Sequence, residues 1–234
     1  MTQTAALPEI LDLTRETILS GDIMRVAAQI PGMNVLSETE LAASLAATLA
    51  AGPGDGDIWV FGYGSLIWNP AFVHDDSRIG QIRGWHRQFC LWTQLSRGCA
   101  KQPGLTLGLD RGGSCRGVAY RIPARAAALE LLVLWRREMV GGAYAPRWVS
   151  VETGLGPVPA ITFAINHAHP RYAGKLDAAE MARVIACATG RLGRCSDYLF
   201  RTVAALRALG IRDARLENLQ QRVEALLAPA HTRP

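Results

Sequence analysis

The 234-residue sequence has no long apolar run and no basic residues at its start. A membrane-spanning helix needs about 20 consecutive apolar residues, and no stretch approaches that length. A secretory signal opens with a basic segment, which Met1-Thr2-Gln3-Thr4 does not supply. We therefore expect a soluble, cytoplasmic protein without membrane association.

The sequence is also poor in residues that suit a metal site or a disulfide framework. The five cysteines form an odd set without a Cys-x-x-Cys pair, which favours free thiols. His167 and His169 alternate at the end of an expected strand, and no third ligand accompanies them. We expect capping or surface roles for these histidines and no bound metal.

Lysine is scarce, because Lys101 and Lys175 are the only two among 25 basic residues. Arginine therefore carries the net charge of +5, and it is spread along the chain with no run longer than Arg136-Arg137. Proteins that bind nucleic acids concentrate positive charge on one face or one arm. We expect no nucleic-acid partner, whereas an attraction for small anions fits this distribution.

Two helices are expected near the N-terminus. The segment from Pro8 has the apolar spacing of a short amphipathic helix that Gly21 ends. Ser37 and Glu40 have the spacing of a capping box, and the alanine- and leucine-rich helix that they begin ends at Gly52.

The chain divides into three parts on this pattern. The stretch Gly-Pro-Gly-Asp-Gly after the second helix is typical of a linker, and short apolar runs typical of strands follow it. The length suits one globular domain with an accessory segment. The expected parts are a helical extension at 1–51, a main domain at 57–227 and a tail at 228–234.

Strands dominate the middle of the main domain and helices dominate its end. Strands are expected at 58–61, 84–92, 105–109, 115–122, 148–152 and 158–165, with a hairpin turn at 110–113. Helices are expected from 123 to about 139 and at about 177–189, 196–209 and 214–227. This order predicts an α+β fold around a mixed or closed sheet, because a doubly wound sheet needs a helix after nearly every strand.

A glycine-rich loop, Gly62-Tyr63-Gly64-Ser65, directly follows the first expected strand. Two glycines two positions apart allow the backbone to present consecutive N–H groups beside a hydroxyl. This pattern is compatible with an anion-binding loop and with a plain tight turn. It lacks the third glycine of a dinucleotide fingerprint and the Gly-Lys-Ser/Thr of a P-loop, so nucleotide binding is not expected.

Glu138 is the most informative acidic residue. It lies at i+7 from Leu131, after Leu134 and Trp135 at i+3 and i+4, so its carboxylate continues an apolar stripe that faces the interior. It also lies in the last helical turn, where the helix dipole disfavours a negative charge. Both effects raise the pKa of a carboxyl, which a general base near neutral pH requires. The alternative is a structural ion pair with Arg137.

These motifs together resemble the bacterial branch of the ChaC-type gamma-glutamylcyclotransferases. The stretch Phe61-Gly62-Tyr63-Gly64-Ser65-Leu66-Ile67-Trp68 is similar to the family's glycine loop. Glu138 follows Tyr63 by 75 positions (138 − 63), where the family has its catalytic glutamate. Further matches at 83–87, 112–120, 169–174 and 196–199 extend the resemblance over about residues 57–227.

The resemblance implies a small closed β-barrel packed with helices, and a cofactor-free enzyme of glutathione degradation. We also expect a monomer. The resemblance implies a carbon–nitrogen lyase in which Glu138 acts as general acid/base while the glutamyl amine attacks its own gamma-carbonyl. The products would be 5-oxoproline and Cys-Gly. The residues implied for substrate binding are Val60, Phe61, Gly62, Tyr63, Gly64, Ser65, Leu66 and Tyr144.

Two other functions stay open at this point. One is the same reaction on other gamma-glutamyl amino acids or amines. The other is a non-catalytic module that binds anions or nucleic acids, which the positive net charge suggests.

Overall fold

The computed structural model describes residues 13–54 and 56–228, and a closed five-strand barrel lies at its centre. The strands are β1 (Ile58–Gly62), β2 (Asp76–Thr93), β3 (Gly104–Ile122), β4 (Tyr144–Thr153) and β5 (Gly156–Ile165). Their order is β1-β3-β2-β4-β5, and parallel pairings of β5 with β1 and with β3 close the barrel. The expected α+β class with a closed mixed barrel is confirmed.

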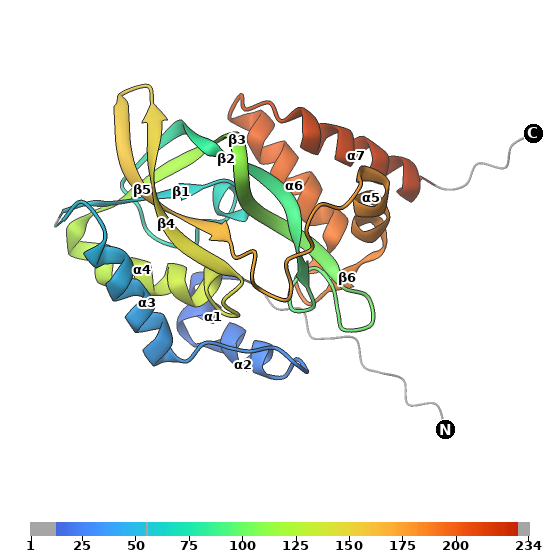
Figure 1. Cartoon of the computed structure of the whole chain (residues 1–234), viewed down its shortest axis with the longest axis horizontal. Coiled ribbons are helices and arrows are strands. Elements are labelled where there is room, and N and C mark those ends of the chain that lie inside the picture. Colours follow the sequence, from blue (N-terminus) through green and yellow to red (C-terminus); the bar gives the residue numbers. More distant parts are fainter. Residues whose placement is uncertain (1–12, 55, 229–234) are drawn as a thin grey trace, which may run out of the picture.

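Two groups of helices cover different sides of the barrel (Figure 1). The first group is α1 (Arg15–Leu19), α2 (Asp22–Ala28), α3 (Glu38–Ala50) and α4 (Ala127–Glu138). The second is α5 (Ala178–Cys187), α6 (Cys195–Ala208) and α7 (Ala214–Leu227). The short elements are η1 (Ser65–Ile67), η2 (Ala124–Ala126), β6 (Thr189–Gly190) and β7 (Gly193–Arg194). Within the described residues, no helix is long and apolar enough to cross a membrane.

The N-terminal helices agree in part with the sequence-based expectation. The capping box is confirmed, since Ser37 Oγ accepts a bond from the Glu40 N–H at 3.2 Å and Glu40 Oε2 accepts one from the Ser37 N–H at 2.7 Å. The expected start at Pro8 lies outside the described residues. Gly21 ends the first helix and α2 begins at the next residue, a helix that the sequence pattern did not predict.

The hairpin expected at 110–113 is wrong. Strand β3 continues through this stretch, and its hairpin partner is β2. Gly112 and Gly113 have φ of +100° and +71°, and they face Gly84 (φ +79°) across a register shift in the β2–β3 ladder. A positive φ occurs in β-bulges as well as in turns. Here the glycines bend the long β2–β3 ribbon and do not reverse the direction of the chain.

Helix α4 is fixed in the core by its apolar stripe. Leu131, Leu134 and Trp135 are buried, as the periodicity predicts. The Trp135 ring packs edge-on against Phe163 of β5, and its indole N–H donates to Ser44 Oγ of α3 at 3.2 Å. The C-terminal end of α4 is therefore held firmly between the barrel and the N-terminal helices.

Candidate active site

A cleft of about 620 Å³ opens between the C-terminal end of α4 and the loop after β1. Its size falls within the roughly 300–1,000 Å³ typical of small-molecule sites. Polar side chains from several helices, strands and loops line it, among them Ser65, Asn69, Arg137, Glu138, Tyr144 and Tyr198. The cleft therefore combines the two features that the sequence singled out, the glycine loop and Glu138.

Glu138 is the last residue of α4, and its side chain retains 14% of its exposure. The Nε atom of Arg137 lies 3.0 Å from Glu138 Oε1. Burial raises the pKa of Glu138, and Arg137 opposes this shift without cancelling it. The ion pair with Arg137, one of the two interpretations that the sequence left open, is present in the structure, whereas the role of Glu138 as general base stays a prediction. A partly exposed carboxyl with a raised pKa is suited to general acid–base work.

Arg137 connects the glycine loop to Glu138. Its Nη1 donates to the carbonyl oxygens of Asn69 and Pro70, and its Nη2 donates to Ser65 Oγ at 3.1 Å. The sequence indicated Arg137 only as a partner of Glu138. The loop contacts join residues about 70 positions apart, so no local pattern could have revealed them.

Close packing leaves little room for a side chain at the two glycines of the loop. A Cβ atom on Gly62 would lie 2.9 Å from Cβ of Leu66, and one on Gly64 would lie 3.2 Å from the hydroxyl oxygen of Tyr198. The chain then turns into η1, where the Ile67 N–H donates to the Gly64 carbonyl at 2.9 Å. This turn places the Ser65 side chain on the cleft.

The residues expected to bind substrate divide into two groups. Ser65 and Tyr144 line the cleft. The side chains of Val60, Phe61, Tyr63 and Leu66 are buried, and the Tyr63 hydroxyl donates to the Phe163 carbonyl at 2.8 Å. Their part in substrate binding, like that of Gly62 and Gly64, stays a prediction that rests on backbone groups of the loop.

Two tyrosines, Tyr144 and Tyr198, line the cleft together with Glu138. The Tyr144 hydroxyl donates to the Leu107 carbonyl at 2.7 Å. Burial, followed by the proximity of Tyr198 and Glu138, raises the pKa of Tyr144 well above its ordinary value. Burial and Glu138 raise the pKa of Tyr198 to about 12. Both phenols therefore stay protonated, which leaves Glu138 as the proton acceptor among the three.

The cleft is strongly positive. Its lining includes Arg15, Arg97, Arg137, Arg171 and Arg201, whereas Glu138 is its one acidic side chain among the described residues. Burial lowers the pKa of the Arg97 and Arg171 guanidinium groups. A positive cleft attracts carboxylates and favours the neutral form of a bound amine.

The two histidines considered as ligands have structural contacts. His167 Nε2 lies 2.7 Å from Asp110 Oδ1, and His169 Nε2 lies 2.9 Å from the Gly141 carbonyl oxygen. In the described part of the chain, no group of three His, Cys, Asp or Glu side chains is arranged to hold a metal ion.

The fold and the cleft define a closed-barrel protein with a cleft of small-molecule size, in which Glu138 is the one carboxyl among the described lining residues. Residues 58–226 match the family described as ChaC-like protein, and the chain belongs to this family. It is 42% identical over 217 residues to the glutathione-specific gamma-glutamylcyclotransferase of Escherichia coli, covering 92% of this chain and 94% of that one. It is 35% identical to glutathione-specific gamma-glutamylcyclotransferase 1 of Mus musculus, over 74% of this chain and 82% of that one.

A solved structure supports the fold. The crystal structure of a gamma-glutamylcyclotransferase specific to glutathione from yeast has a TM-score of 0.69 with this chain at 22% identity. The match covers 76% of this chain and 100% of the yeast chain. The barrel and its helices are therefore those of the gamma-glutamylcyclotransferase fold.

Proposed function

We propose that this protein is a glutathione-specific gamma-glutamylcyclotransferase, a carbon–nitrogen lyase that converts glutathione to 5-oxoproline and Cys-Gly. The observation that carries the proposal is the placement of Glu138, a carboxyl of raised pKa on a positive cleft, tied through Arg137 to the glycine loop. The names of the Escherichia coli and mouse relatives support the same reaction and the same substrate.

Glu138 acts as the base that starts the reaction. As the lone pair of the neutral glutamyl amine attacks the gamma-carbonyl carbon, Glu138 takes one of the two protons of that nitrogen. The new C–N bond closes the five-membered ring, the C–N bond to the cysteinyl nitrogen breaks, and Glu138 returns the proton to that nitrogen. No water and no cofactor enter this balance. The enzyme's main task is to hold the substrate folded back on itself.

The arginines of the cleft and the glycine loop stabilise the substrate groups whose charge changes during the reaction. The positive cleft lowers the pKa of the substrate's ammonium group and so favours the free amine that attacks. The Ser65 hydroxyl and the N–H groups of the glycine loop hold the glutamyl carboxylate or the oxyanion that develops on the gamma-carbonyl oxygen.

The decisive experiment measures 5-oxoproline released from glutathione and from gamma-glutamyl-alanine. Wild type should act on glutathione, and Glu138→Gln should lose the activity because the amide keeps the shape and lacks the basicity. Glu152→Gln is the matched control, since Glu152 is an exposed glutamate on β4 outside the cleft. Turnover of gamma-glutamyl-alanine in place of glutathione would keep the reaction and change the substrate. An active Glu138→Gln variant would refute the mechanism.

We further propose a cytoplasmic monomer. All five cysteines are free, which suits a reducing compartment. The large exposed apolar residues come from several separate elements, for example Leu49 of α3, Ile79 of β2 and Leu226 of α7. A molar mass of twice 25.3 kDa in light scattering would refute the monomer.

A further inference from the structure

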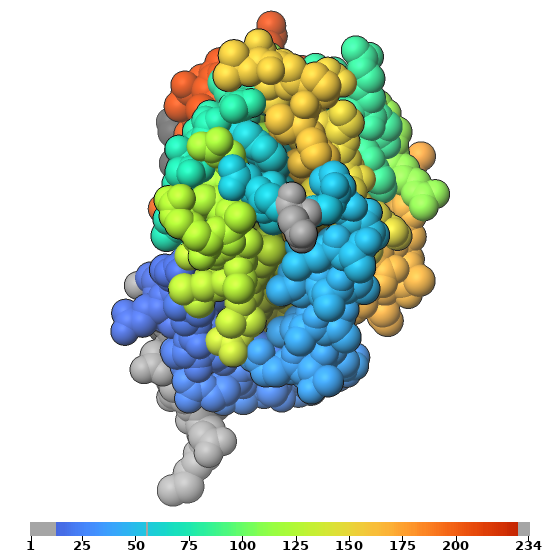
Figure 2. Space-filling model, turned by 90° about the vertical axis from the view of Figure 1, so that its left-hand side faces the viewer, coloured from blue at the N-terminus to red at the C-terminus, as the bar shows by residue number. Residues whose placement is uncertain are grey.

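The segment at residues 13–36 forms one side of the cleft, although the match to the family begins only at residue 58. Five of its residues belong to the cleft lining: Leu13, Thr14, Arg15, Ile23 and Met33. Figure 2 shows this segment, in dark blue, packed against the yellow-green residues of α4. We call residues 13–36 the N-terminal wall.

An ion pair and buried apolar side chains hold the N-terminal wall in place. Arg15 Nη2 donates to Glu130 Oε1 at 2.7 Å, and Glu130 also accepts a bond from the Val73 N–H at 2.8 Å. Burial alone would raise the pKa of Glu130, but these bonds and the charge of Arg15 bring it below its ordinary value. Within the wall, Ile18 and Ala27 are buried. The wall is therefore a fixed part of the fold.

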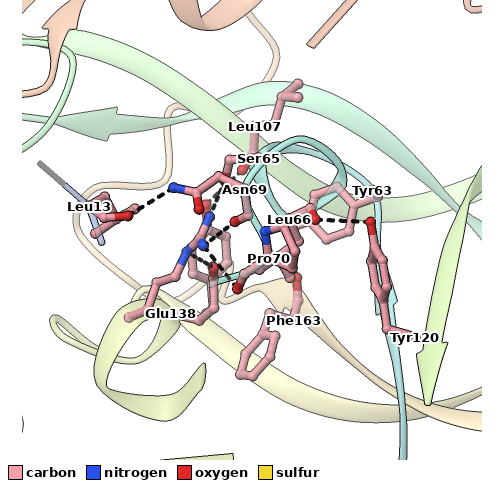
Figure 3. Close-up of polar contacts among 12 residues, drawn as sticks. Leu13, Tyr63, Ser65, Leu66, Asn69, Pro70, Leu107, Tyr120, Glu138 and Phe163 are labelled. Atoms are coloured by element: carbon pink, nitrogen blue, oxygen red, sulfur yellow. Dashed lines mark hydrogen bonds and ion pairs between the residues drawn. The ribbon is translucent and has the colours of Figure 1, made fainter. Parts of the chain in front are cut away.

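The wall is connected to the catalytic group through Asn69 (Figure 3). The Asn69 side-chain N–H donates to the Leu13 carbonyl at 2.9 Å, and the Asn69 carbonyl accepts a bond from Arg137. Arg137 in turn pairs with Glu138. One hydrogen bond thus fixes the start of the wall beside the loop that Arg137 binds.

The other end of the wall meets the cleft at Gly141, three residues after Glu138. A Cβ atom on Gly141 would collide with the Arg171 guanidinium and would lie 3.4 Å from Cε of Met33. Next to it, the Leu36 N–H donates to the Val140 carbonyl at 3.0 Å. The Met33 side chain is therefore placed beside the backbone that leads away from Glu138, on the surface of the cleft.

The chemistry of the wall indicates which part of the substrate it meets. The glutamyl part carries an ammonium and a carboxylate, which need the polar groups and charges that other elements supply. The wall supplies Thr14 and Arg15, whose guanidinium is paired with Glu130, and it adds the apolar side chains of Leu13, Ile23 and Met33. The one apolar side chain of glutathione is the CH₂–SH of its cysteine, and apolar groups that leave water together are stabilised.

We propose that the N-terminal wall is a specificity-determining element, in which Leu13 and Met33 pack against the cysteinyl side chain of the departing dipeptide and limit its size. This inference rests on the proposed function. In this proposal, residues outside the family match select the leaving group. Glu138 and the glycine loop act on the glutamyl part.

The test compares Met33→Ala and Leu13→Ala with Val35→Ala, all in the full chain. Leu13, Met33 and Val35 are each partly exposed, but Val35 is not part of the cleft lining. The measurements are the KM for glutathione and the inhibition constant of S-hexylglutathione, a ligand with an enlarged cysteinyl side chain. Met33→Ala and Leu13→Ala should each lower the ratio of the inhibition constant of S-hexylglutathione to the KM for glutathione about tenfold, as expected for changes in an apolar pocket. Val35→Ala should leave this ratio unchanged.

The ratio separates a role in selection from a structural role, since a merely distorted site weakens both ligands together. Cooperative melting shows which variants are folded, and Leu13→Ala stands in if Met33→Ala does not fold. An unchanged ratio in a folded lining variant overturns the inference while leaving the proposed function intact. If wild type releases no 5-oxoproline from glutathione, the proposed function fails, and this inference fails with it.

Discussion

Nε of Arg137 lies 3.0 Å from Oε1 of Glu138, and the two side chains retain only 3% and 14% of their exposure. The same guanidinium also binds the Ser65 hydroxyl and the carbonyl groups of Asn69 and Pro70. One buried cation therefore holds Glu138 and the glycine loop in a common frame. Such preorganisation spares the site from rearranging when charge develops in the transition state.

The first prediction concerns the geometry of that guanidinium. Arg137→Lys keeps the charge but cannot donate in several fixed directions, so the loop should shift relative to Glu138. Because a displacement of about 1 Å can cost about a hundredfold in rate, kcat should fall by about that factor. Arg136→Lys is the neighbouring control, since Arg136 binds Glu38 and the Leu19 carbonyl outside the cleft. Equal kcat in the two variants would contradict the role of Arg137.

The second prediction concerns the pH dependence of activity. Glu138 must be ionised to accept a proton, and its pKa lies above the ordinary 4.5 because the side chain is buried. Activity should therefore be lost as the pH falls through this raised pKa, and the acidic limb of kcat/KM should lie above pH 4.5. Circular dichroism at each pH checks that the protein stays folded. A limb at or below that value would argue against Glu138 as the base.

The third prediction concerns stability. A carboxyl whose pKa is raised by folding favours the folded state below its unfolded pKa, and this contribution is lost as the pH rises through the folded pKa. Glu138→Gln imitates the protonated form, so its Tm at pH 7 should equal or exceed that of wild type. Each kcal/mol of added stability should raise the Tm by about 2–4 °C. The difference should vanish near the ordinary pKa of 4.5. A variant that melts below wild type at pH 7 would contradict this account.

Local patterns predicted much of the candidate site. The apolar stripe of α4 placed Glu138 at the interior end of a helix, and the glycine spacing located the loop after β1. Both features depend on residues within a few positions of one another, where periodicity and backbone conformation are informative.

Other parts depend on distant contacts or on an ambiguous signal. Gly112 and Gly113 have the composition of a turn, and only the facing Gly84 makes them a bulge. The bond from Arg137 to Ser65 joins residues 72 positions apart. The bond from Asn69 to Leu13 joins the loop to a segment with no motif of its own. Sequence spacing carries no information on such pairs.

The fourth prediction concerns the charge of the cleft. Five arginines line it, and Arg201 is exposed to solvent, so part of the attraction for an anionic substrate acts through water. The KM for glutathione should rise severalfold between about 0.05 and about 0.5 M salt, because the screening length falls over this range. The ethyl ester of the glycyl carboxylate is the control, and its KM should respond less. An identical response of acid and ester would refute an electrostatic role for that carboxylate.

The fifth prediction compares the buried Tyr63 with Tyr144, which is partly exposed on the cleft. The hydroxyls of Tyr63 and Tyr144 donate to the carbonyl groups of Phe163 and Leu107 at 2.8 and 2.7 Å, so replacement of either by phenylalanine should cost about 0.5–1.5 kcal/mol of stability. Tyr144 also lines the cleft, and its oxygen can still accept a hydrogen bond from the glutamyl amine. Tyr144→Phe should therefore raise the KM for glutathione about tenfold, whereas Tyr63→Phe should leave it unchanged. An equal KM in both variants would remove the Tyr144 hydroxyl from substrate binding, and a raised KM in Tyr63→Phe would show that its side chain does act on the substrate.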